Sequence, residues 1–144
     1  MNRVQIVHKN HCNCKSRSKQ DWGLAIARLL VSVFFVSVGT LHFTRPAGFV
    51  QIVPEILPGK KELVYLSGAF EILGGLGLLC SRTRSFAGNG LVALLLAVFP
   101  ANINMAINRI DFGFLPHLLL WARLPLQFVM IYIVHKVSKD PKAG

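Results

Sequence analysis

The sequence predicts an all-α fold, a four-helix transmembrane bundle with short loops and an interfacial outer segment. Of its 144 residues, 53% are hydrophobic and 15% are charged, which is too little polar surface for a small water-soluble domain. The apolar residues collect in four stretches of about 20 residues, the length that a helix needs to cross about 30 Å of hydrocarbon. The basic residues are also divided unevenly between the two sides of such a bundle.

The four predicted spans form one membrane domain, residues 22–137. They lie at about 22–43, 61–80, 86–107 and 115–135. Asp21 is a suitable N-cap for the first span, and Trp22 is typical of a membrane surface. Residues 1–21 lack helical periodicity and are predicted to form a flexible basic cytoplasmic tail. Residues 138–144 form a second cytoplasmic tail.

The segment between the first two spans is too apolar for a solvated loop. Residues 44–59 contain three prolines, yet six of their other side chains are large and apolar (Phe49, Val50, Ile52, Val53, Ile56 and Leu57). We expect a short stretch that lies in the outer membrane interface, over the mouth of the bundle.

The net charge of +10 follows membrane topology rather than nucleic-acid binding, because no basic helix face, aromatic stacking run or zinc-finger spacing accompanies it. One side of the bundle would hold ten basic residues (Arg3, Lys9, Lys15, Arg17, Lys19, Arg82, Arg84, Lys136, Lys139 and Lys142). The opposite side would hold four (Arg45, Lys60, Lys61 and Arg109). The positive-inside rule therefore places both termini in the cytoplasm, where structural disulfides between Cys12, Cys14 and Cys80 are not expected.

Polar residues inside the predicted spans are the candidates for function. A charged side chain near the bilayer centre costs about 2.5–3.5 kcal/mol, so such groups usually face the interior and pair. The set comprises Arg28, His42, Glu71, Asn102, Arg123 and Gln127. Arg28, Ser32, Phe35, Gly39 and His42 recur at steps of four and three, which puts them on one helix face.

Depth indicates which of these groups can meet. Glu71 and Arg123 lie at nearly the same distance from the outer ends of their spans, and a contact between them is expected. Arg28 lies near the cytoplasmic end, where it can reach the inner interface. Pro100 and Pro125 each remove a helical hydrogen bond and free the carbonyls of Leu96 and Trp121. Such carbonyls need interior partners or a water-lined cavity, so the residues together indicate a polar pocket that opens outward.

Simpler interpretations stay open. The Glu71–Arg123 contact is explained equally by interhelical packing, and His42 by a capped surface histidine. The glycines of the second span serve close helix packing. The tail motif His8-x-x-His11-Cys12-x-Cys14 has metal-ligand chemistry but lacks separated ligand pairs, so no metal site is predicted. Paired haem ligation by His42 and His117 is also left open.

Five short motifs resemble those of the DoxX family of small bacterial four-span membrane proteins. They are GTLHF at 39–43, VPEILP at 53–58, SGAFEILGGLG at 67–77, FPANI at 99–103 and RLPLQ at 123–127. Together they cover roughly residues 24–135. Asn104 departs from the pattern, which often has an aromatic residue there. The resemblance implies a bacterial inner-membrane bundle, and the group includes subunits linked to oxidoreduction.

The resulting hypothesis is a redox-associated subunit with an outward-facing pocket for a small ligand such as a quinone. Glu71 and Arg123 would form the charged floor, and His42, Asn102 and Gln127 the polar lining. Its partners would be the lipid bilayer, a redox protein and further copies of the chain, without nucleic acid. The alternative is a non-enzymatic membrane accessory or assembly protein whose polar residues are structural. A small-solute carrier is a third, weaker hypothesis, because the chain is short for alternating access.

Overall fold

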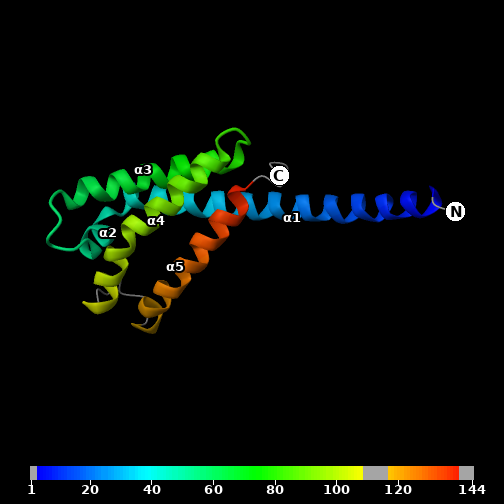
Figure 1. The fold of residues 1–144 in the computed structure, drawn as a ribbon. Helices are drawn as coiled ribbons and strands as arrows, with labels where there is room; N and C mark the ends of the chain where they lie inside the picture. The colour runs from blue at the N-terminus through cyan, green and yellow to red at the C-terminus, as the bar shows by residue number, and fades with distance from the viewer. Residues whose placement is uncertain (1–2, 109–116, 140–144) are drawn as a thin grey trace.

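The protein consists of five helices and, in the part that the structure describes, no strand. The computed structural model describes the backbone of residues 3–108 and 117–139, and the side chains of residues 22–108 and 121–139. The helices are α1 (Arg3–Thr44), α2 (Pro46–Ile52), α3 (Lys60–Leu79), α4 (Arg84–Ile107) and α5 (His117–Ser138) (Figure 1). The all-α prediction is confirmed, and except at the start of α1 the predicted span boundaries agree with these helices to within a few residues.

Three of these helices are long and apolar enough to cross a membrane. They are the segment Trp22–Thr44 of α1, and the whole of α3 and α4. The described residues of α5 are not apolar enough to form a fourth candidate span. Three of the four predicted spans therefore correspond to helices that could cross a membrane. The described part of α5 carries Arg123, Gln127, His135 and Lys136, which lower its apolar character.

The first helix is longer than the sequence predicts. α1 begins at Arg3, so the backbone of residues 3–21 is helical instead of forming an irregular tail. No proline or glycine lies between Arg3 and Trp22, and nothing therefore interrupts a helix that continues from the first span. Figure 1 shows this part of α1 extending beyond the bundle.

The bundle is arranged around the pair α1 and α3, which lie antiparallel and share the most extensive interface (Figure 1). The buried residues of α3 follow steps of four and three along one face: Val64, Gly68, Glu71, Gly75 and Leu78. The opposing face of α1 is the one that the spacing predicts, with Ser32, Phe35, Gly39 and His42 buried. The Ser32 hydroxyl donates to the carbonyl of Gly75 across this interface. α4 packs on α3, and α5 on α4.

Packing differs between the two ends of the bundle. The main apolar core lies toward the end that carries the C-terminus of α5, and consists of Val31, Phe35, Leu78, Leu91, Val134 and Val137. At the same end, Arg28 donates from Nε to the carbonyl of Val137 (2.8 Å) and from Nη2 to that of Lys139 (3.2 Å). A cation there compensates the C-terminal end of a helix dipole. Arg28 thus holds α5 to α1.

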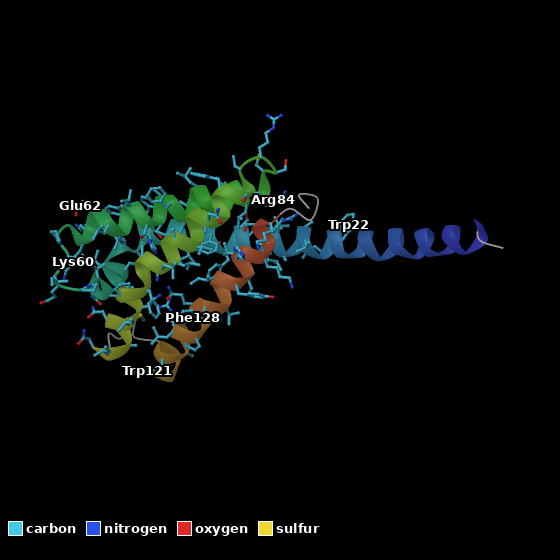
Figure 2. All side chains as sticks on the ribbon, viewed as in Figure 1. Trp22, Lys60, Glu62, Arg84, Trp121 and Phe128 are labelled. Carbon is cyan, nitrogen blue, oxygen red and sulfur yellow. The ribbon has the colours of Figure 1, made fainter. Side chains whose placement is uncertain are left out.

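The outer surface of the bundle is apolar. Exposed large side chains include Leu30, Phe70, Leu73, Phe86 and Phe128, and Figure 2 places Phe128 on the middle of α5. Such extensive exposure is abnormal for a water-soluble monomer and normal for a surface that contacts lipid.

The apolar segment between α1 and α3 contains the short helix α2, with Pro46 in its first turn. Ile52 and Val53 are buried. The amide of Asn104 in α4 donates to the carbonyl of Ile52 at 3.0 Å, and Ile52 also packs with Met105. The segment is therefore fastened to the end of the bundle opposite the main core.

Candidate functional site

A cavity of about 630 Å³ lies beneath α2. It is lined by residues of all five helices and lies at the end where α3 begins and α4 ends. Its volume is in the range of small-molecule sites, about 300–1,000 Å³. Of its 26 lining residues only six are polar: His42, Ser67, Glu71, Asn102, Arg123 and Gln127. Such a cavity suits a largely apolar molecule with one polar head.

The structure therefore brings all five candidate pocket residues to one cavity, together with Pro100. Pro125 lies inside α5 but does not line the cavity. The contacts between the candidates are different from those that the sequence predicts.

His42 is a buried residue of the α1–α3 interface, with 6% of its surface exposed, instead of a capped surface histidine. Its Nδ1 lies 3.1 Å from the carbonyl oxygen of Val64 and 3.0 Å from Oγ of Ser67. The Phe49 ring of α2 covers the imidazole, with 3.9 Å between the ring centroids. The orientation of this ring is thus set from both α3 and α2.

A glycine makes room for His42. A Cβ atom on Gly68 would lie 2.7 Å from Cβ of His42 and 2.9 Å from the backbone oxygen of Gly39. Both distances are shorter than van der Waals contact. The close approach of α1 and α3 at this level consequently depends on glycine in both helices.

Glu71 faces His42, not Arg123. The carboxylate Oε2 of Glu71 lies 4.0 Å from Nε2 of His42, so these two described residues form an ion pair when His42 is protonated. Glu71 is 7% exposed, and its Oε2 has no hydrogen-bond partner. The prediction of a Glu71–Arg123 contact is wrong: no such contact occurs among the described residues, because equal depth does not determine the direction in which each helix turns its side chains.

Arg123 lines the cavity, but its contact is with Met105, which lies outside the cavity lining. Its Nη1 donates to the sulfur of Met105 at 3.3 Å, and the residue as a whole remains exposed. A thioether is a weak acceptor, so this contact satisfies little of the hydrogen-bonding capacity of a guanidinium group.

Asn102 and Gln127 join α4 to α5. Nδ2 of Asn102 donates to Oε1 of Gln127 at 2.7 Å, and Nε2 of Gln127 donates to the carbonyl of Leu95. Pro100 is expected to free the carbonyl of Leu96. The carbonyl that accepts from Gln127 is instead that of Leu95, the preceding residue. Gln127 is buried at 5% exposure. Through these contacts both amides serve the packing of α4 against α5, although Gln127 lies only one turn away from Arg123.

Three further residues contribute to the site without having been predicted as such: Ser67, Phe49 and Asn104. Ser67 precedes Glu71 by one helical turn, so the spacing alone predicts that it lies on the same helix face as Glu71. Phe49 and Asn104 act through α2, whose path over the cavity the sequence does not determine.

No group of three or more His, Cys, Asp or Glu side chains that could hold a metal ion occurs among the described side chains. The tail motif of His8, His11, Cys12 and Cys14, and His117 of the haem alternative, lie outside the described side chains.

One protein-family model matches residues 30–138, most of the predicted membrane domain, and its description is Domain of unknown function (DUF8561). No curated protein and no solved structure matches the chain. The assignment to the DoxX family is therefore wrong, and the oxidoreductase role that rested on it has no support from the comparisons. Small residues at helix contacts, interior prolines and buried polar groups serve any closely packed membrane bundle, so these short motifs did not discriminate between families.

Proposed function

The chain belongs to the DUF8561 family, and we propose that it is a four-span membrane protein that binds a small amphipathic ligand, such as a quinone, in the cavity beneath α2. Its apolar surface and three candidate spans support the membrane location. α5 runs antiparallel to α4 over a similar length, which supports a fourth crossing. The excess of basic residues at the end that carries the C-terminus of α5 supports cytoplasmic termini and an inner-membrane orientation.

One observation carries the ligand proposal: a buried carboxylate, one oxygen of which has no hydrogen-bond partner, borders an apolar cavity of ligand size. A charged group in such surroundings normally pairs or marks a functional site. Glu71 has neither the expected arginine nor a direct hydrogen bond to His42. Both residues line the cavity, so an occupant would lie beside them.

The alternative, an accessory protein with structural polar residues, is favoured by one observation, the bridge from Asn102 through Gln127 to Leu95. It predicts that changing Glu71 alters stability alone and that no small molecule is retained. Polar residues on α4 and α5 can be structural while Glu71 binds a ligand, so the two roles are separable by residue.

Ligand retention and binding test the proposal. We expect native mass spectrometry of gently solubilised protein to show a retained small molecule, and decylubiquinone to compete for its site. For a molecule that donates a hydrogen bond to the Glu71 carboxylate, Glu71→Gln should weaken binding about tenfold, the equivalent of losing about 1.4 kcal/mol in a charge-assisted hydrogen bond.

Glu62→Gln is the matched control, since Glu62 is exposed on the same helix and does not line the cavity (Figure 2). It should leave binding within about twofold, well under one hydrogen bond. Wild-type protein that retains no molecule and binds no quinone saturably would contradict the proposed function.

A further inference from the structure

The gap between His42 and Glu71 is too wide for a direct hydrogen bond. Nε2 of His42 and Oε2 of Glu71 are 4.0 Å apart, whereas N–H···O bonds span about 2.7–3.2 Å. Both atoms belong to residues that line the cavity. A third group is needed to complete the hydrogen bonding of this pair.

The surroundings of His42 favour hydrogen on Nδ1. Nδ1 faces the carbonyl oxygen of Val64, which can only accept, so Nδ1 is the donor. The Ser67 hydroxyl donates to the same carbonyl at 2.9 Å and is left to accept from Nδ1. In the neutral imidazole, Nε2 is therefore an acceptor. Two acceptors, Nε2 of His42 and Oε2 of Glu71, then face each other across the gap.

We infer that the ligand presents a neutral hydroxyl group that donates a hydrogen bond to the carboxylate of Glu71 beside His42. This inference rests on the proposed function and specifies its ligand class. A buried acceptor without a donor carries a large desolvation cost, which an O–H group relieves. A ligand with only carbonyl or ether oxygens would place another acceptor against Glu71.

The rest of the cavity selects against a charged head group. Glu71 and Arg123 line the same cavity with opposite charges, and the Met105 sulfur neutralises none of the charge on Arg123, so a cationic head beside Glu71 would still meet a like charge. An anionic head at this position would meet the carboxylate of Glu71. A hydroxyl brings a donor without a charge, and the 20 apolar lining residues suit an apolar body attached to it.

A matched pair of probes tests this inference: 4-nonylphenol, and its O-methyl ether 4-nonylanisole, which lacks the donor. We expect the full-length protein in detergent to bind the phenol about tenfold more tightly than the ether, as one hydrogen bond to a charged acceptor provides. In Glu71→Leu this preference should fall to within about twofold. Glu71→Gln keeps an acceptor oxygen and should retain an intermediate preference.

The Glu71→Leu variant separates hydrogen bonding from size, because a preference caused by the bulk of the methyl group would persist in it. Glu62→Gln should keep the full preference. Equal binding of phenol and ether by the wild-type protein would overturn the inference and leave the proposed function standing. Binding of decylubiquinone without any binding of the phenol would do the same. If none of the three probes binds and no molecule is retained, both proposals fail.

Discussion

At the scale of single residues, equal membrane depth and a common helix face did not determine partners. Arg123 and Gln127 lie one turn apart on α5, yet one is exposed with a weak sulfur acceptor and the other is buried between α4 and α5. The sequence places five polar residues at similar levels, because levels follow from helix rise, and all five line one cavity. Their pairing depends on helix rotation and tilt, which no spacing rule contains.

Gln127 should therefore matter more for stability than Arg123. Gln127→Leu leaves the Nδ2 donor of Asn102 without its partner and removes the side-chain donor to the carbonyl of Leu95, which should lower the free energy of unfolding by about 1–3 kcal/mol. Arg123→Met keeps the apolar stem and should change it by less than about 1 kcal/mol. Unfolding in mixed micelles measures both values. An equal loss from the two variants would show that Arg123 has a structural role.

At the scale of elements, helix lengths were predictable and helix contacts only partly so. The apolar runs determine α3 and α4 to within about two residues, since bilayer thickness imposes their length. The sequence did not predict the helical backbone of residues 3–21. Amphipathic periodicity indicates that one face of a helix is buried, and a helix that extends beyond the bundle has no buried face and therefore needs no such periodicity. The path of α2 depends on tertiary contacts such as Asn104 with Ile52.

The α1–α3 contact should be sensitive to a single methyl group. In Gly68→Ala the new Cβ would meet His42 Cβ and the Gly39 backbone, neither of which can move freely. We expect a loss of about 1–3 kcal/mol in unfolding free energy. The same substitution at Gly90 meets nothing within 4 Å and should be neutral or stabilising by up to about 1 kcal/mol. Thermal melting in detergent compares the two, and a similar shift in both would refute close packing at Gly68.

At the scale of the whole molecule, the open question is how often the chain crosses the membrane. The described part of α5 carries the least apolar sequence of the long helices proposed to span, yet α5 lies against α4 throughout the bundle. Arg28 also holds its C-terminal end beside α1. These contacts support a fourth crossing independently of hydropathy.

Sidedness can be measured with single cysteines in a chain whose native cysteines are changed to serine. A membrane-impermeant maleimide should label Glu55→Cys in intact bacterial cells. It should label Ser81→Cys and Lys139→Cys only after permeabilisation, because an even number of crossings returns residue 139 to the cytoplasm. All three positions are exposed. Labelling of Lys139→Cys in intact cells would show that α5 does not cross.

The unequal packing of the two ends has a thermodynamic consequence. The main core fills one end of the bundle with side chains, whereas the other end contains a cavity of about 630 Å³. A molecule bound only by the folded chain raises its stability by mass action, by about 2.7 kcal/mol at a hundred times its dissociation constant. The melting temperature of this protein would then report the composition of the surrounding lipid, with stripped preparations the most fragile.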